Sequence, residues 1–246
     1  MNRIIIITLF LSATFFSNAQ ETETRTLRSF ESVSVSQGIE AFLAEGTSES
    51  ARVEVDGNID IEEVLTEVNG GHLKIHLEGN NYRNVDVRVY VTYVNLESLK
   101  ASSAGSIEVE DRVTCDCDFD IDVSSAGDVE IDLESNSLDL EASSAGDIDV
   151  RVRTGSIDAS ASSAGDIDIE GIAKSVDAKA SSSGDISAYD LVCDNAELRA
   201  SSGGSITITV KEELKARSSS GGSISYKGNP EYTDKESSSG GSVRGR

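Results

Sequence analysis

Tryptophan is absent from this chain of 246 residues, and aromatic residues account for only 5% of it. Pockets that hold small molecules and sugars commonly use aromatic side chains, so this composition argues against a groove that stacks on sugar rings. Histidine occurs only as His72 and His76, which leaves the serines beyond residue 100 without a neighbouring imidazole. A serine nucleophile needs an adjacent base and an oxyanion hole. We therefore expect no serine-based catalysis.

Basic residues are also scarce. The chain has 21 lysines and arginines against 44 acidic residues, for a formal net charge of −23. A strongly negative surface repels nucleic acid and anionic lipid, and it attracts cations. We therefore exclude nucleic acid as a partner.

The first 19 residues have the features of a secretory signal peptide. Arg3 supplies a positive charge, Ile4 to Phe16 form a short apolar run, and Ser17-Asn18-Ala19 resembles a cleavage site. The run is short for a membrane span. We expect cleavage after residue 19 and export through the inner membrane to the periplasm, the outer surface or the medium. No membrane span would then remain in the mature chain; an uncleaved anchor is the alternative.

A Ser-Ser-Ala-Gly motif, or a close variant, returns about every 19 residues along the second half of the chain. The motif glycines are Gly105, Gly127, Gly146, Gly165, Gly184, Gly204, Gly222 and Gly241. A short fixed period indicates a stack of similar coils that each contact only their neighbours. The repeat is too short for a propeller blade, and it lacks helical periodicity. We therefore expect an all-β chain that folds as a parallel, right-handed β-helix, or solenoid.

Apolar and polar residues alternate on both sides of each glycine, as in strands with one buried face. The first inward column after the glycines comprises Ile107, Val129, Ile148, Ile167, Ile186, Ile206, Ile224 and Val243. The Ser-x-Gly segment between the two strands reads as a sharp corner, where glycine would adopt a positive φ. Serine hydroxyls in this segment would satisfy backbone groups. Alanines replace larger core residues near residues 155–190, which predicts a narrower and weaker waist.

The three cysteines, Cys115, Cys117 and Cys193, leave at least one thiol unpaired within the chain. Cys193 follows the other two by four coils, or about 19 Å, which is too far for a disulfide. We expect it to pair with neither. The spacing favours three small buried side chains over a Cys-x-Cys metal or redox site, because no histidine or third cysteine is near.

Residues 27–98 lack the repeat but contain several strand-like segments separated by turns. Residues 59–65 could form one or two helical turns. A stack needs a cap that shields its first coil from strand addition. We therefore expect residues 20–246 to form one elongated domain, with a cap and irregular coils over 20–100 and Ser-Ser-x-Gly repeats over 101–246.

Four blocks of the sequence, in this order, resemble the DUF2807 family, also described as putative auto-transporter adhesins with a head GIN domain. The blocks run from Phe30 to Glu40, Val53 to Asn58, Leu65 to Ile75 and Val91 to Gly105. Gly38-Ile39-Glu40 matches the Gly-Ile-Asn stretch of the family except at Glu40. The resemblance covers about residues 28–226. It implies an exported β-helical domain, and it carries over no catalytic residue.

Acidic residues recur at two outward positions in successive coils. One column contains Asp128, Asp147, Asp166 and Asp185, and the other contains Glu108, Glu130, Asp149 and Asp168. Carboxylates about 4.8 Å apart repel, and calcium between coils would offset this repulsion. A solvated acidic face is the simpler interpretation and the one we favour. His72 and His76 lie about 13 Å apart on one strand, too far to share a metal.

These observations favour an exported, non-enzymatic β-helix of the cell envelope that acts in adhesion or display. Its ligand would be a glycan or a surface protein, and the only cofactor we consider is Ca²⁺ in the acidic columns. The alternatives are a structural or cation-binding envelope protein and a polysaccharide-active enzyme. Catalytic carboxylates cluster in a groove, whereas the acids here are periodic, so the enzyme is the least favoured.

Overall fold

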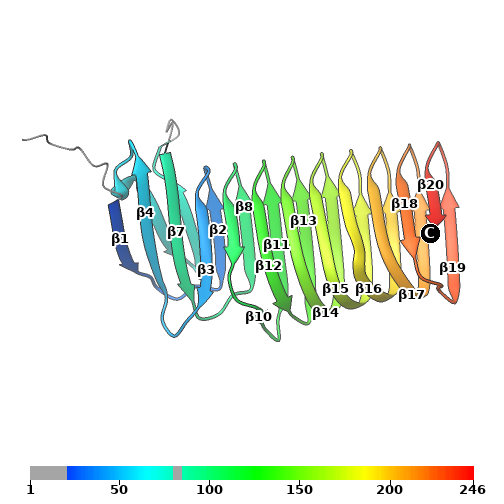
Figure 1. Cartoon of the computed structure of the whole chain (residues 1–246), viewed down its shortest axis with the longest axis horizontal. Coiled ribbons are helices and arrows are strands. Elements are labelled where there is room, and N and C mark those ends of the chain that lie inside the picture. The colour runs from blue at the N-terminus through cyan, green and yellow to red at the C-terminus, as the bar shows by residue number, and fades with distance from the viewer. Residues whose placement is uncertain (1–20, 80–84) are drawn as a thin grey trace, which may run out of the picture.

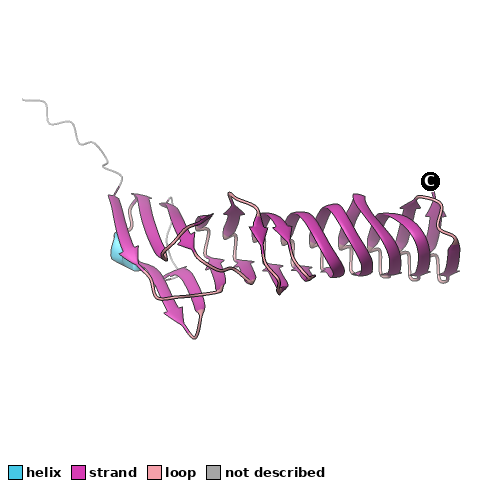
Figure 2. Cartoon of the chain, turned by 90° about the horizontal axis from the view of Figure 1, so that it is seen from below, coloured by secondary structure: helices cyan, strands magenta, loops and turns pink. Residues whose placement is uncertain are grey.

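The computed structural model describes residues 21–79 and 85–246 and forms a long β-solenoid. Figure 1 shows the coils stacked along the long axis, from β1 at one end to β19 and β20 at the other. The all-β class and the coil length of about 19 residues are confirmed. The only helix among the described residues is one 3-10 turn, η1 (Ile61–Glu63), which falls within the segment predicted to be helical (Figure 2). The predicted signal peptide, residues 1–19, lies outside the described residues.

The repeats form two parallel sheets. Strands that precede a corner glycine stack in the first sheet, here called the pre-corner sheet, and strands that follow it stack in the post-corner sheet. Four long strands bend from one sheet into the other. The strands of this part are β8 (Ser98–Ser102), β9 (Ser106–Val109), β10 (Val113–Thr114), β11 (Asp118–Ser124), β12 (Asp128–Glu134), β13 (Ser137–Ser143), β14 (Asp147–Ser162), β15 (Asp166–Ala180), β16 (Asp185–Ala200), β17 (Ser205–Ser218), β18 (Ser223–Lys227), β19 (Tyr232–Ser237) and β20 (Ser242–Gly245).

The predicted inward columns form the core. Equivalent residues lie beside each other in successive coils, as Ile148 and Ile167 do. All members of the first column are buried except Val243, which is partly buried in the last coil. β-branched side chains suit this position because their stiff rotamers pack well on a pleated surface. The buried cluster is continuous from Phe30 to Ile224.

The corners differ from the prediction in one respect. Serine and alanine carry the positive φ, at 52° for Ser163 and 61° for Ala164, and Gly165 does not. The Gly165 amide donates to the Ser162 carbonyl at 2.9 Å, so the corner is a type I′ turn. Glycine is required because it lies against the backbone of the preceding coil.

Backbone groups of neighbouring coils satisfy each other at the corners. The amide of Ala145 donates to the carbonyl of Ser163 at 3.2 Å, and the amide of Ala164 donates to Ser182 in the same way. Backbone carbonyls of the next coil therefore accept from these corner amides, where we expected the serine hydroxyls to satisfy the backbone groups. The serine column itself faces solvent; its members are Ser103, Ser125, Ser144, Ser163, Ser182, Ser202, Ser220 and Ser239.

The N-terminal part places its strands out of chain order. Its strands are β1 (Glu21–Thr26), β2 (Ser32–Ser36), β3 (Glu40–Glu45), β4 (Ser50–Gly57), β5 (Val64–Asn69), β6 (His72–Leu77) and β7 (Val85–Tyr93). Strand β2 lies between β6 and β8, and β3 lies between β7 and β9, all parallel. Antiparallel pairs of β1 with β4, β4 with β7 and β5 with β6 lie beyond them. The β2–β3 coil therefore joins the repeats directly, and the antiparallel strands cover its other side.

Polar groups close both ends of the stack. At the N-terminal end, Arg25 donates to the carbonyls of Ile61 and Val64, and Arg28 donates to the carbonyl of Val68 at 2.6 Å. These arginines occupy carbonyls of η1 and β5. At the C-terminal end, Thr233 and Lys235 take the positions that Leu214 and Ala216 hold one coil earlier. Polar side chains at these positions disfavour the addition of another strand to the end of the stack.

The cysteines correct one prediction. Cys115 and Cys117 are partly buried and form a disulfide with each other, with their Cα atoms 5.2 Å apart. They are therefore not independent buried side chains. Cys193 is a free, buried thiol, as expected. Burial, followed by the charge of Asp194, raises its pKa to about 12.

Candidate functional site

The post-corner sheet carries the predicted acidic columns. Asp147 pairs with Asp166 and Asp149 pairs with Asp168 across the same two coils, and all four side chains face outward. The full set is Glu108, Asp128, Glu130, Asp147, Asp149, Asp166, Asp168 and Asp185. The structure thus brings these residues together on one face. A shallow groove of about 410 Å³ crosses this face and is lined by members of the second column with Arg112 and Arg151.

The acidic columns are electrostatically unfavourable at neutral pH. Burial raises the pKa of Asp128, and nearby carboxylates raise it further. Burial also raises the pKa of Asp185, where a hydrogen bond with Ser205 opposes the shift and Asp168 adds to it. Burial, and then Asp147 and Asp168, raise the pKa of Asp149. The cause is desolvation of the charged form together with like charges in neighbouring coils.

Among the described residues, no group of three or more histidine, cysteine or acidic side chains is arranged to hold a metal ion. Calcium requires six to eight oxygens at about 2.3–2.6 Å, and regularly spaced single carboxylates on a flat sheet do not converge in this way. The columns therefore present a row of negative charges to solvent on this face.

The pre-corner sheet carries a second groove, which the sequence analysis missed. It has a volume of about 780 Å³ and extends over successive coils from β11 to β17. One side is a column of small polar residues, Ser137, Ser156, Ser175 and Asn195. The other is a column of acids, Asp120, Asp139, Asp158, Asp177 and Glu197. The 19-residue spacing of these acids is visible in the sequence and could have predicted the column.

Cations border the acidic column of this groove. Lys179 lies 3.6 Å from Asp158 and 3.3 Å from Asp177, and Arg199 lies 3.4 Å from Asp177. Farther toward the N-terminal end, Asp139 has a raised pKa, because of burial first and then the neighbouring carboxylates. Exposed ion pairs contribute little stability. Because carboxylates and cations lie side by side, the groove presents both acceptors and donors of hydrogen bonds to solvent.

Two of the few aromatic residues meet on the outer face of the N-terminal part. Phe42 and Tyr90 stack with their ring centroids 5.2 Å apart, and the guanidinium of Arg52 lies 3.8 Å from the Tyr90 centroid. These residues are far apart in sequence, and the pairing of β3 and β4 with β7 brings them together. The cluster continues the row that contains Glu108. The low aromatic content thus did not prevent a local aromatic cluster.

Both histidines have structural partners. The ring of His72 hydrogen-bonds the hydroxyls of Ser32 and Ser34 at 2.9 and 2.8 Å. Burial, followed by Lys100 and Lys74, lowers its pKa. His76 lies 3.4 Å from Glu67. The interactions of His72 join β2 to β6, which is a structural task.

The Gly-Ile-Glu segment leads from the corner of the β2–β3 coil, which contains Gly38, into β3, which begins at Glu40. Gln37 and Gly38 both have positive φ, of 63° and 72°, and they align with the Ser103-Ala104 corner of the next coil. The Gln37 side chain accepts from the Leu77 amide and donates to the Gly79 carbonyl, both at 2.8 Å. The start of this segment therefore belongs to a structural corner.

Three crystal structures share this architecture. A "putative adhesin" from Parabacteroides distasonis has a TM-score of 0.83 and 22% identity over 93% of this chain and 98% of that chain. A "putative adhesin" from Parabacteroides merdae has a TM-score of 0.83 and 21% identity over 92% of this chain and 96% of that chain. A "putative lipid binding protein" from Parabacteroides distasonis has a TM-score of 0.80 and 20% identity over 92% of this chain and 96% of that chain. At this identity the likeness shows the fold.

No curated protein matches the chain. In the part of the chain that the structure describes, no helix has the length and hydropathy to cross a membrane. Residues 29–230 match the family model described as "Putative auto-transporter adhesin, head GIN domain". This match covers more than half of the sequence, so the chain belongs to the DUF2807 family.

Proposed function

We propose that this chain is an exported, non-enzymatic protein of the cell envelope that binds an extended ligand along the groove of the pre-corner sheet. The observation that carries the proposal is the groove itself, which offers the same polar side chains in coil after coil. The adhesin description of the family supports binding to surface molecules. We further infer that residues 20–246 act as one rod, since the core is continuous over most of this range.

The ligand that best fits this groove is a hydroxyl-rich linear glycan. Carboxylates accept hydrogen bonds from sugar hydroxyls, and serine and asparagine both donate and accept. A polymer that contacts several coils gains affinity from many weak contacts at high effective concentration. Asp139 and Asp158 lie at the centre of the acidic column, beside Ser137 and Ser156. A surface protein with basic side chains is the competing ligand.

The test compares two charge-matched variants. Asp139→Asn/Asp158→Asn alters the pre-corner groove, and Asp147→Asn/Asp166→Asn removes the same charge from the post-corner face. On a glycan array, we expect the first variant to lose at least about tenfold in affinity and the second to bind as the unmodified protein does. Equal loss in both would indicate an effect of net charge alone. Binding only to proteins, or to nothing on the array, would contradict the glycan assignment.

A structural or cation-binding role is the second candidate. The raised pKa values of Asp128 and Asp149 favour it, since burial and then carboxylate repulsion cause them, and cations would relieve the repulsion. Deletion of the protein separates the two: loss of cell attachment supports adhesion, and an envelope defect without loss of attachment supports the structural role. Release of reducing ends from polysaccharide would support an enzyme.

A further inference from the structure

The Cys115–Cys117 disulfide lies in an insertion that the solenoid does not need. The step from Gly105 to Gly127 is 22 residues, where most other steps are 19. The cysteines fall between the end of β10 at Thr114 and the start of β11 at Asp118. They are therefore outside both strand ladders. Two backbone hydrogen bonds tie the segment to the next coil, from Cys115 to Glu134 and from Asn136 to Cys117.

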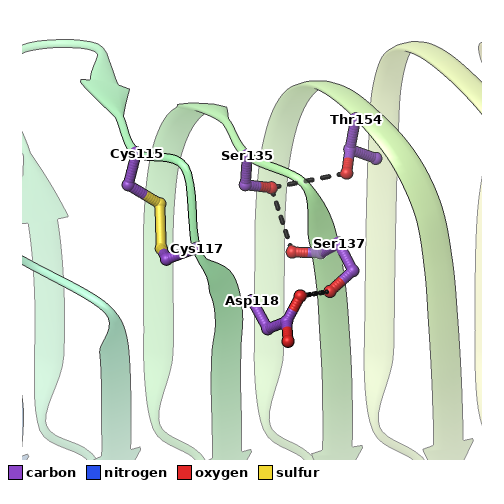
Figure 3. Close-up of a disulfide and its surroundings, with 6 residues drawn as sticks. All are labelled: Cys115, Cys117, Asp118, Ser135, Ser137 and Thr154. Atoms are coloured by element: carbon purple, nitrogen blue, oxygen red, sulfur yellow. Dashed lines mark hydrogen bonds between the residues drawn. A yellow bond between two sulfur atoms is a disulfide. The ribbon is translucent and has the colours of Figure 1, made fainter.

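The bridge is poorly placed to act as a staple. Its cysteines are separated by only two positions in sequence. A disulfide that closes so short a loop removes little entropy from the unfolded chain. Figure 3 shows that the adjacent coil forms its own polar contacts, from the Ser135 hydroxyl to Thr154 and to the Ser137 carbonyl. These contacts do not involve either sulfur.

The bridge is also less buried than the third cysteine, although both of its cysteines pack against the core. Cys115 and Cys117 are partly exposed, whereas Cys193 is fully buried. Cys193 lies four coils away in the same column, so it cannot exchange with the bridge. Any thiol that attacks the bridge must therefore come from another molecule.

We propose that Cys115–Cys117 is a thiol–disulfide exchange site for a neutral or cationic partner that carries a thiol. A partner thiolate attacks one sulfur and forms a mixed disulfide, while the other cysteine leaves as a thiolate and takes up a proton. A second partner thiol then resolves the mixed disulfide. The partner is oxidised to its disulfide, and the two electrons reduce the bridge to a dithiol. This proposal does not rest on the glycan groove, although Asp118, the residue after Cys117, also lines the end of that groove.

Local charge selects the partner. Asp116 and Asp118 are exposed acidic residues that flank Cys117 in sequence, and the whole chain carries a formal charge of −23. The nearby cation Arg112 is paired with Asp132. An anionic thiol is repelled on approach and a cationic thiol is attracted, and added salt screens both effects. The rate of mixed-disulfide formation should therefore depend on the charge of the attacking thiol.

The experiment treats the oxidised full chain with cysteamine, a cationic thiol, or with 2-mercaptoethanesulfonate, an anionic thiol, and follows the adducts by mass spectrometry. We expect cysteamine to react at least about fivefold faster per thiolate, and the ratio to approach one in 1 M salt. Cys193 serves as an internal control that should stay unmodified while the chain is folded. Cys115→Ser/Cys117→Ser should form no adduct.

Two results would overturn the proposal. One is bridge reduction no faster than modification of Cys193, since the disulfide would then open only when the chain unfolds. The other is an equal rate for the two thiols at low salt. The Asp116→Asn variant provides a further check, because removal of this exposed charge should narrow the difference between the thiols without unfolding the chain.

Discussion

Gly165 lies against the carbonyl group of Ala142 in the preceding coil. A Cβ atom built on Gly165 would be 2.5 Å from the carbonyl carbon and oxygen of Ala142. Atoms cannot approach so closely, and the obstacle is backbone in a stacked sheet, which cannot rotate away. The same contact recurs at the glycines of the other repeat corners, including Gly146 and Gly184. The repeated glycine thus sets how closely two coils stack.

Replacement of Gly165 by alanine should destabilise the solenoid strongly. We expect a loss of about 3 kcal/mol or more, because the new methyl group forces adjacent coils apart. Urea unfolding followed by circular dichroism measures this change. An effect below about 1 kcal/mol would show that the coils separate easily.

The neighbouring substitution Ala164→Gly should have the opposite sign or no effect. Ala164 has a φ of 61°, which is strained for alanine and free of strain for glycine. Coils farther along already use glycine here, as at Gly203 and Gly221. We expect the free energy of unfolding to increase by up to about 1 kcal/mol. The greater conformational entropy of glycine in the unfolded chain reduces this gain. A clear loss of stability would contradict the argument from φ.

The acidic columns predict that the fold gains stability as the pH falls below neutrality. The pKa values of Asp128, Asp149, Asp166 and Asp185 are raised in the folded chain. Between the unfolded and folded pKa values, the folded state binds more protons, so stability decreases as the pH rises through this window. The urea midpoint should therefore increase from pH 7 toward pH 4.5. Asp149→Asn should raise the midpoint at pH 7 and flatten the profile.

Calcium should stabilise the chain no more than magnesium at the same ionic strength. Both ions screen the carboxylate columns, and among the described residues no convergent set of ligands favours calcium. Thermal unfolding at matched salt, with EDTA as the blank, measures the difference. A shift specific to millimolar calcium would re-establish the ladder of Asp128, Asp147, Asp166, Asp185, Glu130, Asp149 and Asp168 as a binding site.

Removal of the polar groups at the C-terminal end should promote association. Thr233→Val/Lys235→Val restores apolar side chains at inward positions of the last described coil, and it removes the hydrogen bond from Lys235 to the Tyr226 hydroxyl. Light scattering should show larger species that grow with concentration. Lys211→Val, at an exposed position, is the control. The same distribution in all three proteins would mean that these residues do not protect the end.

The alanine-rich coils should exchange amide hydrogens faster than their neighbours. Ala161 and Ala180 align with Ala142, whereas Ala159 and Ala178 are buried where the earlier coil places Leu140. They bury less apolar area, and local opening is easier where less area is buried. Hydrogen exchange read by mass spectrometry should find the least protected repeat strands within residues 155–190. Faster exchange in β13 would contradict this prediction.

Much of the architecture could be predicted because each inward residue repeats in register. The columns that begin at Ile107 and at Asp128 were both identified from spacing alone, and the structure confirms their directions. The corner was located correctly, but its positive φ was assigned to Gly165 and not to Ser163 and Ala164. Spacing marks a turn without showing which residue bends. Close contact between coils, which decides the place of glycine, is a property of the stack.

The candidate site was predicted only in part. The acidic column of the pre-corner groove has the same period as the one that was recognised, yet the groove itself is a property of the folded sheet. The stacking of Phe42 on Tyr90 and the order of β2 between β6 and β8 arise from pairings between distant segments. The Cys115–Cys117 bridge was missed because the two residues were placed on a strand face, and the insertion instead turns them toward each other.

The sequence by itself determined the coil, the core and the charge of the faces, because a period of about 19 residues forces each coil to repeat the pattern of its neighbour. Tertiary structure alone decided the N-terminal strand order, the closure of the ends by Arg25 and Lys235, and the location of the grooves. The physical reason is that periodicity describes nearest neighbours. Ends, insertions and hollows are set by contacts between residues that have no fixed spacing.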